Sequence, residues 1–111
     1  MEGITRKLPK HVIFGYEFMG TAFLLFAINA SRGDALGIGF TIFAMLLIGG
    51  PLTGGHYNPA VSIGVFFNED NKGEIVGNFV TMLLAQFTGA LFGVAMAWIG
   101  LAHLTHNGYG G

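Results

Sequence analysis

Long apolar runs separated by short polar interruptions dominate the chain. Three long runs cover residues 12–30, 36–52 and 75–102, and a shorter run covers residues 59–67. As helices, the long runs would measure roughly 28, 25 and 42 Å, against a bilayer hydrocarbon core of about 30 Å. The second run is the shortest, and it is interpreted as a span because of its neighbours. The pattern predicts a single-domain, all-α membrane protein with three transmembrane helices.

The short run, "PAVSIGVFF", would form a helix of roughly 14 Å, about half the thickness of a membrane. Asparagine is a preferred N-cap residue and proline is favoured at the first helical position, so Asn58 and Pro59 predict a helix start. Such a helix can lie at membrane depth only where protein surrounds it or where it lines a water-filled cavity. The alternative is a short amphipathic helix on the membrane surface, and spacing alone leaves both open.

Composition agrees with a membrane protein and excludes several other classes. Hydrophobic residues make up 52% of the 111 residues and charged residues 10%, whereas about a quarter of an ordinary soluble domain is charged. The formal net charge of −1 offers no basic surface for nucleic acid. The absence of cysteine excludes disulfides and Cys-based metal sites. His103 and His106 lack a third ligand, and neither an activated nucleophile nor a phosphate-binding loop is recognisable, so no metal, cofactor or enzymatic activity is indicated.

Basic residues are distributed unequally between the two sides that the spans define. Arg6, Lys7 and Lys10 precede the first span and Lys72 precedes the third, whereas only Arg32 lies between the first and second spans. Lysine and arginine accumulate in cytoplasmic loops. The sequence therefore predicts an N-terminus inside, the Arg32 loop outside and a C-terminus outside.

The residues before the short helix have the chemistry of a neutral-solute path. The N-terminus of a helix carries unpaired N–H groups and about half a positive charge, which repels cations. The Asn58 amide can donate to the oxygen of a solute such as water, and an extended approach through Gly54, Gly55 and His56 leaves backbone carbonyls free to accept. Donors and acceptors along a narrow path beside a positive helix end are features of pores that pass neutral solutes and exclude ions.

The stretch "GPLTGGHYNPAVSIGVF" resembles the first signature loop of the aquaporin and glyceroporin family, the major intrinsic proteins. Two flanking segments resemble the family's first and third helices, namely "EFMGTAFLLF" and "LLAQFTGALFG". The resemblance covers nearly the whole chain. It implies three spans with a re-entrant half-helix between the second and third, which together form one of two inverted repeats.

The resemblance also assigns roles to individual residues. It implies that Asn58 is a pore-facing donor, that Gly54, Gly55 and His56 form a carbonyl-lined approach, and that Pro59 and Ala60 start the half-helix. Reading back from Asn58 without gaps, the family's constriction position on the second helix falls on Ile38, where many water-selective members have an aromatic residue. Isoleucine there implies a more apolar wall; alternatively, Ile38 simply faces lipid or another helix.

Glu17 and Gln86 match the buried polar residues of the family's first and third helices, and the resemblance implies that they hold the loop backbone. A carboxylate at mid-bilayer costs about 2.5–3.5 kcal/mol on insertion scales, so Glu17 requires partners. The alternatives are a neutral Glu17 bonded to helix backbone and a Gln86 that forms an interhelical hydrogen bond with no particular target.

Small residues recur every fourth position along the third span. Such a stripe is typical of a helix-contact surface, either within the chain or between subunits. Its members are Ala85, Gly89, Gly93 and Ala97.

Members of the family normally combine two halves, each with an Asn-Pro-Ala start, and the second half adds an arginine to the filter. This sequence contains one such start, and its arginines are Arg6 and Arg32. We therefore expect a half-channel that passes water or a small neutral solute when a second half completes it. The alternative is a non-conducting structural subunit of a larger membrane assembly, and a truncated gene product is a third reading.

Overall fold

The computed structural model describes residues 3–5 and 7–108, and within them the chain forms four helices. Helices α1, α2 and α4 are long and apolar enough to cross a membrane, and α3 is too short to do so. The prediction of an all-α protein with three candidate spans and one short helix is confirmed, and the chain is a multi-pass integral membrane protein. The helices are α1 (Lys10–Ala30), α2 (Ala35–Thr53), α3 (Pro59–Asn68) and α4 (Lys72–His106).

Both ends of α2 are set by capping residues. Asp34 caps α2, because its Oδ2 accepts a hydrogen bond from the Gly37 N–H at 2.7 Å. Gly54 ends α2 in the left-handed conformation, with φ of 89°. The predicted span 75–102 lies inside the longer α4. Both ends of α4 include polar residues, which lie beyond the limits of the apolar run.

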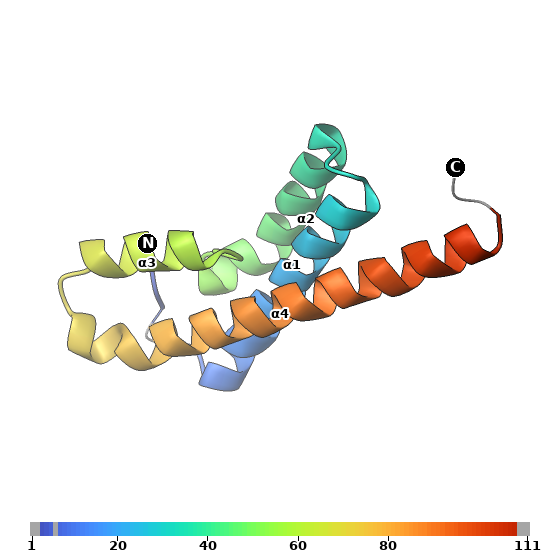
Figure 1. The fold of residues 1–111 in the computed structure, drawn as a ribbon. Helices are drawn as coiled ribbons and strands as arrows, with labels where there is room; N and C mark the ends of the chain where they lie inside the picture. The colour runs from blue at the N-terminus through green and yellow to red at the C-terminus, as the bar shows by residue number, and fades with distance from the viewer. Residues whose placement is uncertain (1–2, 6, 109–111) are drawn as a thin grey trace.

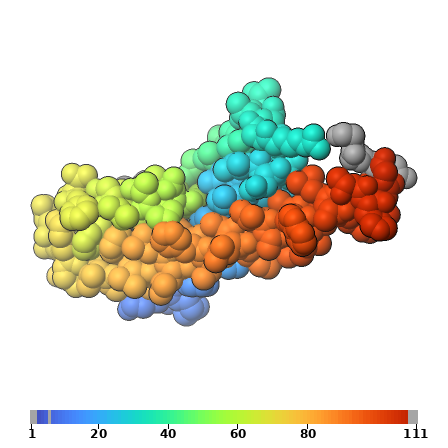
Figure 2. Space-filling model, in the orientation of Figure 1, coloured from blue at the N-terminus to red at the C-terminus, as the bar shows by residue number. Residues whose placement is uncertain are grey.

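Helix α4 runs the full length of the molecule. Its 35 residues make it about 52 Å long, which exceeds a hydrocarbon core of about 30 Å, so α4 must tilt or protrude. Helix α1 crosses the middle of α4, α2 packs beside α1, and α3 lies along the first part of α4 (Figure 1). In the space-filling view, α4 extends across the whole molecule, and α3 and α1 both pack against it (Figure 2).

The main helix contact joins α1 to α4 through the stripe of small residues. Gly89 and Gly93 are buried against the backbone of Phe18 and Ala22. A Cβ atom added at Gly89 would lie 2.5 Å from the Phe18 carbonyl oxygen, and one added at Gly93 would overlap the Ala22 carbonyl oxygen. Of the two alternatives that the sequence left open, the stripe therefore forms a contact within the chain.

The N-terminal segment, residues 3–5, packs between the end of α3 and the start of α4. Ile4 is only 1% exposed. Gly3 donates its N–H to Glu69 Oε1 at 3.1 Å, and the Asn78 side chain donates to the Thr5 carbonyl oxygen at 2.6 Å. Ile4 belongs to a small apolar core that it shares with Ile13, Ile75 and Met82. These contacts tie the start of the chain to α3 and α4.

Helix α2 is the least covered span. Only 11% of its most apolar window is buried, and large apolar side chains cover its outer face. Exposed apolar surface of this extent indicates contact with lipid or with other membrane helices. The most exposed of these side chains are Leu36, Phe40, Phe43 and Leu47.

Candidate functional site

The short helix begins where the sequence predicted, at an asparagine cap followed by proline. Asn58 has an extended backbone, and its Oδ1 accepts a hydrogen bond from the Ala60 N–H at 2.9 Å, while Pro59 occupies the first helical position. The Asn58 side chain is exposed, and its amide nitrogen has no hydrogen-bond partner among residues 3–5 and 7–108. The helix start therefore presents a free amide donor.

Two glycines turn the chain from α2 into this helix start. Gly54 and Gly55 have φ values of 89° and 62°, a region that favours glycine. The Thr53 hydroxyl accepts a hydrogen bond from the Gly55 N–H at 3.1 Å and so stabilises the turn. The backbone of residues 54–57 is thereby held out of both helices, as a carbonyl-lined approach requires.

The Glu17 carboxylate lies at the centre of the site and is fully buried. Its Oε1 accepts hydrogen bonds from the Thr53 hydroxyl at 2.6 Å and from the His56 N–H at 3.3 Å. Its Oε2 accepts from the Tyr57 N–H at 2.8 Å and from Gln86 Nε2 at 2.9 Å. All four partners are donors, so both oxygens of the side chain act as acceptors. Glu17 thus anchors two consecutive N–H groups of the loop.

Gln86 has a different set of partners from the one that the sequence suggested. Its Nε2 donates to the Glu17 carboxylate and, at 2.7 Å, to the Ser62 hydroxyl of α3. The Ser62 oxygen also lies 2.9 Å from His56 Nδ1. Among the described residues, Gln86 makes no hydrogen bond to the loop backbone. It acts on the loop through Glu17 and on α3 through Ser62.

Three residues of the site were not singled out from the sequence: Thr53, Tyr57 and Ser62. Thr53 lies in the last turn of α2, Tyr57 in the loop and Ser62 in the first turn of α3. Such positions do not by themselves mark a residue as part of a site. A buried carboxylate must nevertheless be hydrogen-bonded. The need of Glu17 for donors was therefore the one available signal, and it does not say which hydroxyl or N–H groups supply them.

Ile38 lies near the start of α2 and is half-buried. It precedes Gly54 by most of the length of α2, about 24 Å along the helix axis. The hydrogen bonds around Glu17 form one network, here called the Glu17 network, whose members are Glu17, Thr53, His56, Tyr57, Ser62 and Gln86. Ile38 is not part of this network, and its constriction role stays a prediction. Near the end of α4, Asn107 Nδ2 lies 3.0 Å from His103 Nε2, and no group of three metal-binding side chains occurs in residues 3–5 and 7–108.

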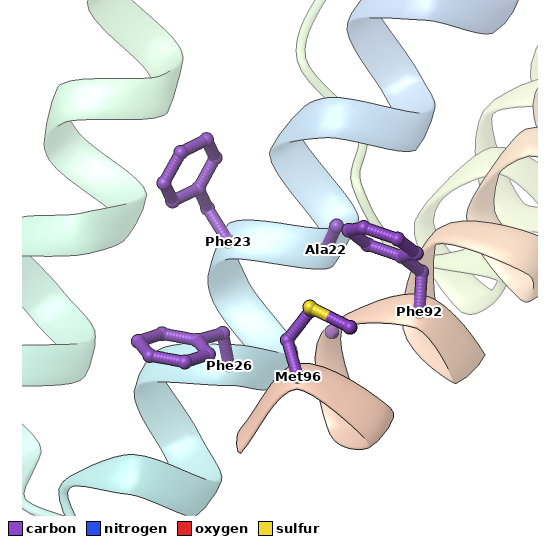
Figure 3. A pocket seen from close by; sticks show the side chains of 6 residues that line it. Ala22, Phe23, Phe26, Phe92 and Met96 are labelled. Carbon is purple, nitrogen blue, oxygen red and sulfur yellow. The ribbon is translucent and has the colours of Figure 1, made fainter. Parts of the chain in front are cut away.

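An apolar groove lies between α1 and α4, away from Asn58. Its volume is about 230 Å³. Figure 3 shows Phe23 and Phe26 projecting from α1, and Phe92 and Met96 from α4. A site that orients a polar solute needs a few convergent polar groups. No polar side chain from the described part of the chain lines this groove, so Glu17 with its partners and the start of α3 are the better candidate site.

Comparisons with known proteins bear on this geometry. Aquaporin Z of Brucella melitensis is 32% identical over a match 117 positions long, gaps included, and the match covers 85% of this chain and 50% of that protein. Nodulin-26 of Glycine max is 39% identical over a match 94 positions long, and this match covers 78% of this chain and 32% of that protein. The chain is a distant member of the aquaporin family. The probable aquaporin PIP2-7 of Oryza sativa subsp. japonica is 39% identical over 64 residues, 58% of this chain and 21% of that protein.

The aquaporin relationship is partial in extent. The chain spans half or less of the length of these curated relatives. No family model matches the chain. No solved structure matches it either. The relationship therefore rests on the sequence matches, together with the helical fold and the apolar spans.

Proposed function

We propose that the chain is one half of an aquaporin-type channel that passes water or a small neutral solute when a second half completes it. The observation that carries this proposal is the start of α3, where a capped helix presents the free Asn58 amide. The positive end of the α3 macrodipole disfavours cations there. The amide donor and the nearby carbonyls of the approach suit a neutral, hydrogen-bonding solute and give no support for catalysis.

The Glu17 network supports a re-entrant α3 over a helix on the membrane surface. Glu17 and Gln86 lie well inside the two spans that carry them, and both are fully buried. Because Glu17 binds the N–H groups of His56 and Tyr57, the start of α3 must lie at the depth of Glu17. Irregular backbone at that depth is stable where protein satisfies it or where it lines a water-filled cavity.

We also propose the orientation with the N-terminus inside. Lys7 precedes α1, and Lys10 and Lys72 are the first residues of α1 and α4, whereas Arg32 lies in the α1–α2 turn. The starts of α1 and α4 are adjacent, because a Cβ atom added at Gly77 would lie 3.1 Å from the Lys10 side chain. Arg6 contributes to the same bias and lies outside the described residues. The positive-inside rule then assigns the α3–α4 turn to the cytoplasm.

A structural subunit of a larger membrane assembly is the competing role. Its support in the sequence was the missing second half together with the stripe of small residues on α4. In this fold the stripe is buried, with Gly89 and Gly93 against α1, so the scaffold role keeps only the first of these two supports. Gentle detergent extraction followed by mass determination of all co-migrating chains separates the two. A second Asn-Pro-Ala half in a small complex supports the channel; a large complex without one contradicts it.

Replacing Asn58 with aspartate tests the channel proposal directly. Aspartate is an equally good N-cap, so α3 keeps its start while the amide donor becomes an acceptor. Because a hydrogen bond contributes about 0.5–1.5 kcal/mol net, we expect solute permeability to fall roughly 3–10-fold. The measurement is stopped-flow swelling of vesicles that contain the completed assembly.

The matched control is Asn71→Asp. Asn71 is also exposed and also precedes a helix, but its side chain makes no capping hydrogen bond and it lies outside the Glu17 network. We expect its permeability to equal that of the unmodified protein. Equal rates for Asn58→Asp and Asn71→Asp would count against a channel through this site.

A further inference from the structure

Tyr57 is the loop residue directly before Asn58, and its side chain is enclosed. It is 4% exposed, and its hydroxyl donates to the Met45 carbonyl oxygen of α2 at 2.6 Å. Its backbone φ of 52° is unusual for a residue other than glycine, asparagine or aspartate. A bulky residue persists in this conformation only where its surroundings hold it there.

Two glycines on different helices make room for the Tyr57 side chain. A Cβ atom added at Gly20 of α1 would overlap the Tyr57 ring. One added at Gly49 of α2 would instead overlap the hydroxyl oxygen. Its next contacts would be a tight one of 3.3 Å to Cζ, which a shift of a few tenths of an ångström would relieve, and an ordinary one of 3.6 Å to Tyr16 Cδ1. The ring therefore fits against α1 and the hydroxyl against α2.

We propose that Tyr57 is a positioning residue that sets the location of Asn58 relative to α1 and α2. Its backbone N–H is fixed by Glu17, and its side chain is fixed by Gly20, Gly49 and the Met45 carbonyl. Anchors on both the backbone and the side chain leave the following peptide little freedom. The proposal rests on the channel function only in the sense that Asn58 is the group being positioned.

The two glycines provide a compensation test. In Gly49→Ala, the new methyl group meets the Tyr57 hydroxyl, so the loop must shift. Tyr57→Phe removes that oxygen, so Gly49→Ala/Tyr57→Phe should recover the geometry of Tyr57→Phe alone. Gly20→Ala is the matched control, because its methyl group meets ring atoms that phenylalanine keeps. Tyr57→Phe should therefore fail to rescue Gly20→Ala.

The readout is the distance distribution between spin labels on α2 and α3, measured by pulsed electron resonance in the full chain. The natural sequence contains no cysteine, so Phe43→Cys and Ile63→Cys, both at exposed positions, label uniquely. We expect a shifted or broadened distribution for Gly49→Ala and for Gly20→Ala. The distribution should recover only in the Gly49→Ala/Tyr57→Phe pair. Vesicle swelling of the completed assembly should show the same order, with a loss of roughly fivefold for Gly49→Ala.

The possible outcomes separate this inference from the channel proposal. An unchanged label distance in Gly49→Ala would overturn the positioning role, as would equal rescue of both glycine variants by Tyr57→Phe. Compensation in the label distances without any solute flux in the unmodified assembly would support the positioning role and contradict the channel. Compensation in both readouts supports both.

Discussion

Replacing Glu17 with glutamine is expected to lower the free energy of unfolding by about 1–3 kcal/mol. With the NH₂ group at the Oε2 position, the Tyr57 N–H and Gln86 Nε2 lose their acceptor. With it at the Oε1 position, the His56 N–H loses its acceptor, whereas the Thr53 hydroxyl can turn to the Gly49 carbonyl oxygen and accept from the NH₂ group. A buried donor without a partner costs about 1–3 kcal/mol. Rotating the amide does not restore every hydrogen bond, because each oxygen position faces a backbone N–H group. Reversible denaturant titration in mixed micelles, followed by circular dichroism, measures the change.

Glu69→Gln is the matched control for this prediction. Glu69 is more exposed than Glu17, and within residues 3–5 and 7–108 it accepts a single long-range hydrogen bond, from the Gly3 N–H. A glutamine oxygen can accept that bond, so we expect a change below about 1 kcal/mol. Similar losses for the two variants would contradict the assignment of Glu17 as the acceptor that organises the loop.

The helical framework was predictable because it follows from rules that act locally. The lengths of the apolar runs identified the spans, and the preference of asparagine and proline for helix starts located the beginning of α3 at Pro59. The need of a buried carboxylate for donors identified Glu17 as a residue with partners. The first two conclusions depend on residues that are close together in the sequence. The third depends on the free-energy cost of moving one side chain out of water.

The composition of the site was less predictable because it depends on how distant helices meet. Thr53, Ser62 and Gln86 come from α2, α3 and α4. They converge only because α2 and α4 pack against α1 and α3 packs against α4. The stripe of small residues indicated a contact but not its partner, since any closely approaching helix satisfies such a stripe. The position of Tyr57 between two glycines follows from the loop conformation, which no local pattern specifies.

The same reasoning predicts that the contact between α1 and α4 tolerates no added methyl groups. In Gly89→Ala/Gly93→Ala, the new Cβ atoms would meet the backbone of Phe18 and Ala22, which cannot move aside as the end of a side chain can. Overpacking costs about 1–3 kcal/mol per site, so we expect a loss of roughly 2–6 kcal/mol in the free energy of unfolding. Because Glu17 and Gln86 lie on these two helices, their separation should also disrupt the Glu17 network. The fluorescence of the single tryptophan, Trp98, provides the measurement on α4 itself.

The control for this variant comes from the same helix. A Cβ atom added at Gly73 or Gly100 of α4 would have no heavy atom within 4 Å. Gly73→Ala/Gly100→Ala therefore makes the same chemical change without a clash, and it gains up to about 1 kcal/mol per site from the higher helix propensity of alanine. The two double variants should thus change stability in opposite directions. Equal effects would mean that helix propensity, rather than close backbone approach, explains the glycines of α4.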